Sequence, residues 1–112
     1  MPVGRDRVFR LDQESPSSHR VIPKTAAYQM VPRDTLVKTD PTAGGFTVTL
    51  PPVVECAGGI YVLKQIASAN SATVVDKGDA NVAVSIALNA ATETLILFSD
   101  GEQWYTIYNV TL

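Results

Sequence analysis

The chain has 112 residues, of which 46% are hydrophobic and 18% are charged, and its formal net charge is −2. This length and composition predict one globular domain and exclude a disordered chain. The small net charge does not indicate a nucleic-acid partner, and no run of 18 apolar residues predicts a membrane span. The single cysteine excludes an intrachain disulfide, which is typical of a protein made in a reducing cytoplasm.

The first 24 residues differ in character from the rest of the chain. They carry five basic and three acidic residues, a net charge of +2, whereas the remaining residues carry four basic and eight acidic residues, a net charge of −4. Three prolines and scattered apolar pairs cannot build a core by themselves. We therefore predict an extended N-terminal arm over residues 1–24 and a β-domain over residues 25–112. A frayed terminus without a role is the alternative interpretation of the arm.

From Ala26 onward the sequence predicts short strands separated by Gly, Pro, Asn and Asp. The expected strands are 27–30, 35–39, 45–50, 59–66, 72–77 and 82–88, followed by a hairpin over 92–109. Alternation of apolar and small or polar residues is clearest at 45–50 and 82–88, and no helical period of adequate length is present. The pattern predicts an all-β fold, namely an antiparallel β-sandwich, jelly-roll-like or barrel-like domain of about eight short strands.

The predicted C-terminal hairpin is apolar on both faces. Asp100-Gly101 favours a tight type I′ turn, which sets Leu97 opposite Trp104. Because neither apolar face tolerates water, we expect one face to lie on the chain's own core and the other to be covered by a second copy. The expected subunit interface comprises Leu95, Leu97, Trp104 and Tyr108. The opposite face carries Ile96, Phe98, Tyr105 and Ile107.

Residue types that support catalysis or metal binding are scarce. The only histidine, His19, lies in a Ser- and Pro-rich loop of the arm and is a poor candidate for a general base. Cys56 has apolar and acidic neighbours, which favour a structural thiol over a nucleophile. The acidic turns at 76–79 and 100–102 would bind Ca²⁺ only if they converged, and neither has the spacing of an EF-hand loop. We therefore expect no enzyme activity, no metal and no cofactor.

The aromatic residues of the hairpin have two interpretations. Packing in a core or an interface is the main expectation for Trp104, Tyr105 and Tyr108. Stacking on a sugar ring is the alternative. The predicted register puts Tyr105 on the face opposite to the other two residues, so it does not predict a single aromatic platform.

Three segments resemble a β-domain that recurs in virion proteins of tailed bacteriophages. They are GGFTVTLPP, AGGIYVLKQIASANSATVVDKGDANV and TLILFSDGEQWYTI. In that family a VTLP strand, a Gly-led strand, an Asn-Ser-Ala-Thr-Val hairpin and a closing SDG hairpin follow one another. The domain occurs in tail-fibre segments and in small capsid-decoration, or cement, proteins. The resemblance covers about Thr35 to Ile107, and it implies a trimer with a structural task and no catalytic residues.

The resemblance favours a capsid decoration protein, because the sequence ends directly after the hairpin, where a fibre would continue into shaft or tip. Such a protein would bind the major capsid protein on the outer surface of the virion as a homotrimer and stabilise the shell, after synthesis in the host cytoplasm. Neither nucleic acid nor membrane is an expected partner. The arm residues expected to contact the capsid are Arg5, Arg7, Phe9, Arg10, Leu11 and Arg20. The alternative is a tail-fibre or spike module that binds a receptor or glycan.

Overall fold

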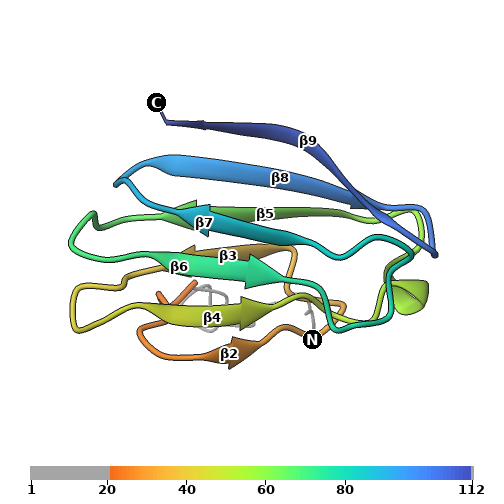
Figure 1. Ribbon diagram of the computed structural model, residues 1–112, viewed down its shortest axis with the longest axis horizontal. Helices are drawn as coiled ribbons and strands as arrows, with labels where there is room; N and C mark the ends of the chain where they lie inside the picture. The colour runs from red at the N-terminus through yellow and green to blue at the C-terminus, as the bar shows by residue number, and fades with distance from the viewer. Residues whose placement is uncertain (1–20, 112) are drawn as a thin grey trace, which may run out of the picture.

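The computed structural model describes residues 21–111, and the arm residues predicted to contact a capsid lie outside this range. The described part is built mainly from strands, which confirms the mainly-β prediction (Figure 1). In chain order the elements are β2 (Tyr28–Gln29), β3 (Leu36–Thr39), β4 (Phe46–Thr49), the 3-10 helix η2 (Val54–Cys56), β5 (Ile60–Gln65), β6 (Ala72–Val75), β7 (Ser85–Leu88), β8 (Glu93–Ser99) and β9 (Trp104–Thr111).

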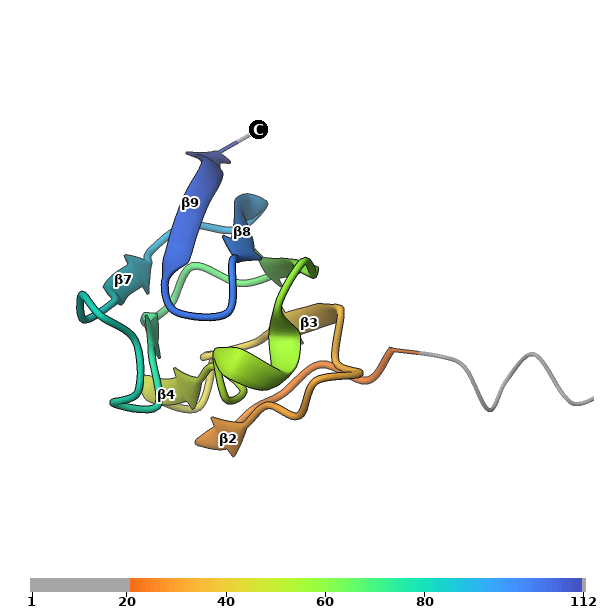
Figure 2. The same cartoon turned by 90° about the vertical axis from the view of Figure 1, so that its right-hand side faces the viewer.

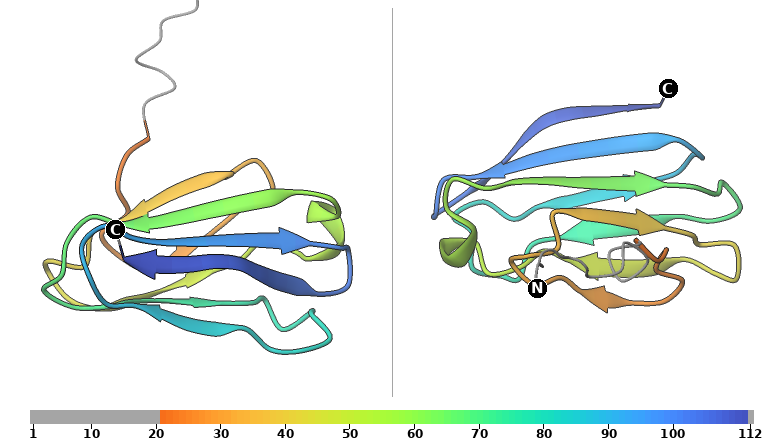
Figure 3. Two further views of the ribbon diagram at one scale, coloured as in Figure 1. Left: turned by 90° about the horizontal axis from the view of Figure 1, so that it is seen from above. Right: turned by 180° about the vertical axis from the view of Figure 1, so that it is seen from behind.

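Two four-stranded sheets enclose the core. One sheet has the order β2-β4-β6-β7 and the other has the order β3-β5-β8-β9. The first sheet lies in front in Figure 1, and the second lies in front when the molecule is seen from behind in Figure 3. Figure 2 shows the two sheets end-on.

Both sheets are mixed, so the domain is mainly β but is not clearly an antiparallel sandwich or jelly roll. Strands β2, β4 and β6 pair in parallel, as do β3 and β5, whereas β6–β7, β5–β8 and β8–β9 are antiparallel. The parallel pairs arise because the chain from β2 to β6 changes sheet at every connection. The next strand in the same sheet is then two strands later and runs in the same direction, with the intervening strand serving as the crossover.

The core is contiguous between the two sheets. Val48, Val74 and Leu88 of the first sheet are fully buried with Leu63 and Leu97 of the second. The alternation seen in the sequence at residues 45–50 therefore did predict which side chains face the core.

The strand expected over residues 82–88 begins later than its alternation predicts. Only Ser85–Leu88 forms β7, and Val82 is 65% exposed. The backbone of Val82 bonds instead to the side chain of Gln103, which accepts from the Val82 N–H and donates to the Val82 carbonyl. This interaction holds residues 81–82 against the β8–β9 turn rather than in the sheet.

A buried glutamine connects the two sheets at one end of the core. The Gln65 carbonyl oxygen accepts hydrogen bonds from the Thr39 hydroxyl and from the Ala72 N–H, each at 3.3 Å. Its amide nitrogen donates to the carbonyl of Asn70, whose side chain in turn donates to Pro41. Because Gln65, Thr39 and Ala72 are fully buried, their polar groups have no access to water as an alternative partner.

Replacing Gln65 with leucine is expected to lower the free energy of unfolding by about 1 to 3 kcal/mol. Leucine keeps much of the volume but leaves the Thr39 hydroxyl and the Ala72 N–H buried without an acceptor. Urea unfolding followed by circular dichroism measures the change. Thr47→Val is the control and should change little, because Thr47 is exposed and its side chain bonds to no other residue of 21–111. An unchanged midpoint for Gln65→Leu would contradict the role of the network.

Candidate interaction surface

The β8–β9 turn is wider than the predicted two-residue type I′ turn. Ser99 pairs with Trp104, so the loop spans residues 100–103. Two side chains set this geometry: the Asp100 carboxylate accepts the N–H groups of Glu102 and Gln103, and the Ser99 hydroxyl oxygen accepts the N–H of Gly101. The pairing therefore moves by two residues relative to the prediction. A shift of two keeps each side chain on its predicted face.

A β-bulge changes the faces farther along β9. Leu97 pairs with Thr106, but Ile96 pairs with Tyr108, so Ile107 is an extra residue on β9. The bulge moves Tyr108 to the face that carries Ile96. The prediction that Tyr108 shares a face with Trp104 is therefore wrong.

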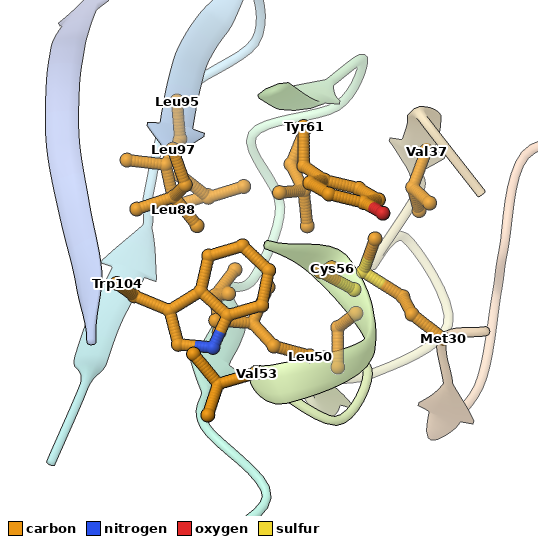
Figure 4. Packing of buried hydrophobic residues seen from close by; sticks show 13 residues of the cluster. Met30, Val37, Leu50, Val53, Cys56, Tyr61, Leu88, Leu95, Leu97 and Trp104 are labelled. Carbon is orange, nitrogen blue, oxygen red and sulfur yellow. The ribbon is translucent and has the colours of Figure 1, made fainter. Parts of the chain in front are cut away.

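The predicted subunit interface divides between the core and the surface. Leu95 and Leu97 are fully buried and Trp104 is 3% exposed, all within the chain's own core. Figure 4 shows the Trp104 indole pointing towards Leu50 and Val53. These three side chains form the core face of the hairpin, so they offer no surface to another subunit. Tyr108 is 40% exposed and is the member of the predicted set that faces outward.

The outward side of the β3-β5-β8-β9 sheet, which we call the outer face, is apolar over two of its three rows and carries two lysines and a threonine in the third. The pairing of the strands arranges its side chains in rows across the sheet. The rows are Ile60, Phe98 and Tyr105; then Leu36, Val62, Ile96 and Tyr108; then Lys38, Lys64, Thr94 and Val110. Leu36, Ile60 and Tyr105 are each more than 40% exposed. Removing such aliphatic and aromatic side chains from water would lower the free energy.

The outward side of the other sheet is different. Its strand pairing places Gln29, Thr47, Thr49, Thr73, Val75, Ser85 and Ala87 on the side away from the core. Apart from Val75, these side chains are polar or small, as expected for a sheet that faces water on one side. The contrast between the two sheets identifies the outer face as the candidate interaction surface.

Strand β9 has little cover on its inward side. Thr106 and Asn109 pair with the buried residues Leu97 and Leu95, yet both are exposed. The opposite sheet therefore does not extend beneath this part of β9. Because β9 is also the last strand of its sheet, its outer backbone edge is unpaired among residues 21–111. Such an edge is a site for pairing with another chain.

The charged groups of the outer face lie at opposite ends of the strands. Lys38 and Lys64 are adjacent at one end, where the Lys64 ammonium donates to the Thr94 hydroxyl at 2.9 Å. At the other end the Tyr105 hydroxyl donates to the Asp100 carboxylate at 3.2 Å. Backbone N–H groups of Glu102 and Gln103 lower the pKa of Asp100, and the hydrogen bond to Asp100 raises the pKa of Tyr105.

The lowered pKa of Asp100 predicts a loss of stability in acid. A carboxyl group whose folded pKa lies below its usual 3.8 contributes stability above that pH, and the contribution is lost as pH falls through the folded pKa. Asp100→Asn keeps the acceptor oxygen and removes the titration, so its free energy of unfolding should fall less between pH 5 and pH 2 (about the range of this linkage). Urea unfolding at several pH values measures this. Glu55→Gln is the control, because Glu55 is exposed and its side chain has no hydrogen bond within the described part of the chain. An equally reduced pH dependence of the unfolding free energy in Glu55→Gln would contradict the assignment to Asp100.

The lone cysteine is part of the core. Cys56 is 3% exposed, and burial raises the pKa of its thiol, which disfavours the thiolate. Burial also raises the pKa of the neighbouring Tyr61 to about 12, and the Tyr61 hydroxyl donates to the carbonyl of Pro32. Cys56 and Tyr61 thus have structural roles as far as the described residues show.

Residues 21–111 contain no group of three or more His, Cys, Asp or Glu side chains placed to hold a metal ion. The carboxylates of the acidic turns accept backbone N–H groups: Asp76 accepts from Gly78 and Val84, Asp79 accepts from Val53, and Asp100 accepts from its own turn. None of the helices in the same part of the chain has the length and hydropathy that a membrane crossing requires.

Sequence reasoning missed the contribution of β3 and β5 to the surface. The signal was present in Ile60–Leu63, where four consecutive apolar residues supply both faces of a strand. Comparison of the chain with protein-family models, with curated proteins and with solved structures gives no match.

Proposed function

We propose that the chain is a structural virion protein, a capsid decoration protein that binds the outer capsid surface as a homotrimer and stabilises the shell. The observation that carries the proposal is the apolar outer face of one sheet opposite the polar outward side of the other. A surface of this kind is typical of a protein that works in an assembly. The resemblance of three segments to bacteriophage virion β-domains suggests that this assembly is a virion.

The proposal gives the two parts of the chain different tasks. The outer face joins the subunits, and the N-terminal arm attaches the trimer to the major capsid protein. Three arms on one trimer raise the effective concentration of weak contacts, so that boundaries between capsid subunits are bridged. The body of the domain includes Lys24, whose N–H donates to Lys38 and whose carbonyl accepts from Asp40. The arm is therefore best removed before this point.

Co-sedimentation with tailless shells tests the proposed function. Purified chain is mixed with capsids, without tails, of the virus that encodes it, and the pelleted fraction is measured. The full chain should pellet with the shells, whereas a chain lacking residues 1–20 should remain in solution with an unchanged circular dichroism spectrum. Replacing Arg5, Arg7 and Arg10 with glutamine is a milder variant and should weaken binding. Full decoration by the truncated chain would refute the role of the arm.

A receptor- or glycan-binding module of a tail fibre or spike is the second candidate. It is favoured by the bulge in β9, which brings Tyr105 and Tyr108 to the same face, next to Phe98. Exposed aromatic rings on one face suit stacking against a sugar. A glycan array probed with the full chain tests this function, with Tyr105→Ala as the matched variant. Binding that Tyr105→Ala abolishes would favour it, and an array without hits would count against it.

A further inference from the structure

The outer face carries opposite charges at two diagonal corners. Lys38 lies on β3, the strand at one edge of the sheet, and pairs across to Lys64. Asp100 lies beyond the other end of the strands, beside Tyr105 on the opposite edge strand, β9. Neither Lys38 nor the Asp100 carboxylate forms an ion pair with another described residue. Between the two corners the face is apolar.

The dimensions of the sheet fix the direction of this diagonal. Three strand spacings separate β3 from β9, which is about 14 Å. Four residues along β5 separate the row of Ile60 from the row of Lys64, which is about 13 Å. The line from the lysine corner to the acidic corner therefore crosses the strands at roughly 45°.

We propose that the occupant of the outer face is a second copy of this chain, placed head to tail so that Lys38 of one copy lies against Asp100 and Tyr105 of the next. This inference rests on the proposed function and specifies how its subunits meet. In a head-to-tail contact each copy gives its lysine corner to one neighbour and its acidic corner to the other, so the contact repeats from copy to copy until a ring closes. In a ring of three, the strands run at about 45° to the three-fold axis, which brings both corners to the same height.

Charge complementarity within one face identifies the partner as another copy. The acidic corner offers the Lys38 ammonium a carboxylate and the ring of Tyr105, which is 51% exposed. An arrangement that set like corners together would place lysine against lysine and lose this attraction. The apolar rows between the corners, with Val62 and Ile96 at their centre, would then be removed from water by the neighbouring copies.

A double-mutant cycle on the full chain tests the contact. Sedimentation equilibrium measures the concentration at which the assembly dissociates, for wild type, Lys38→Gln, Asp100→Asn and the double variant. Each single variant should raise this concentration about tenfold, because every trimer contains three copies of the pair. The double variant should dissociate at a concentration no higher than that of the single variant that associates more weakly. Asparagine keeps the acceptor oxygen of the turn, and Lys77→Gln, exposed in the β6–β7 turn, is the control and should have no effect.

The outcomes separate this inference from the proposed function. Non-additivity in the cycle supports contact between the corners. Additive losses, or single variants that behave as wild type, overturn the contact while leaving a self-associating protein. A wild-type chain that stays monomeric overturns both the contact and the trimer. A trimer that shows the predicted cycle but fails to pellet with shells overturns the decoration function alone.

Discussion

Replacing Trp104 with alanine is expected to lower the free energy of unfolding by about 3 to 5 kcal/mol. The indole is 3% exposed and meets the ring of Tyr61 edge-on, with 5.5 Å between centroids and 81° between planes. Alanine would remove this aromatic contact and leave a cavity against Leu50 and Val53 (Figure 4). Urea unfolding followed by circular dichroism measures the loss. Protein concentration must be held constant because self-association adds to the apparent stability.

Two further substitutions make this prediction specific. Trp104→Phe should cost less than alanine, since the indole Nε1 is buried without a hydrogen-bond partner among the described residues and phenylalanine gives up no such bond. Tyr105→Ala changes the next residue, which points outward, and should have a small effect on the unfolding of the isolated domain while weakening self-association. A loss below about 1 kcal/mol for Trp104→Ala, well short of the usual cost of deleting a buried aromatic residue, would place the indole outside the core.

The sequence predicts the strands well because each depends on local pattern. Alternation at Phe46–Leu50 identifies the core-facing side chains, and Pro51 ends that strand as expected from a residue that cannot donate to the ladder. The pairing of the strands depends on where the connections lead. Nothing in the local pattern says that the chain changes sheet between β3 and β4, or again between β4 and β5. Alternation and turn residues therefore could not predict that the sheets are mixed.

The sequence predicts that one side of the hairpin is buried and the other is exposed, but it assigns the wrong residues to the exposed side. Two apolar faces on the hairpin imply that one side stays outside the core when the other side forms it. Which side of the hairpin is buried depends on the position of the other sheet, and that sheet covers Leu95 and Leu97. The Asp100-Gly101 pair favours a tight turn in isolation, but backbone N–H groups that donate to the Ser99 hydroxyl and the Asp100 carboxylate stabilise a four-residue loop. The bulge at Ile107 has no sequence signal that we can identify, and it alone reverses the face of Tyr108.

Ile96→Lys is expected to abolish self-association while leaving the domain folded. Ile96 lies in the central row of the outer face, between Val62 on β5 and Tyr108 on β9. In a single copy it is only partly buried, so a lysine can extend its ammonium group into water. Between two copies the same ammonium would be buried against apolar side chains without a counter-charge, which costs several kcal/mol. Sedimentation velocity should therefore show a monomer at concentrations where wild type is assembled.

The matched control places the same charge on the other sheet. Thr73 lies on the outward side of β6, among polar and small residues, so Thr73→Lys should leave the sedimentation coefficient unchanged. Circular dichroism should give superimposable spectra for both variants, because neither side chain belongs to the buried core. If Ile96→Lys assembled as well as wild type, the outer face would be free of subunit contacts. Self-association would then use another surface, and the edge of β9 is a candidate, since Thr106 and Asn109 are exposed there and no other strand of residues 21–111 pairs with it.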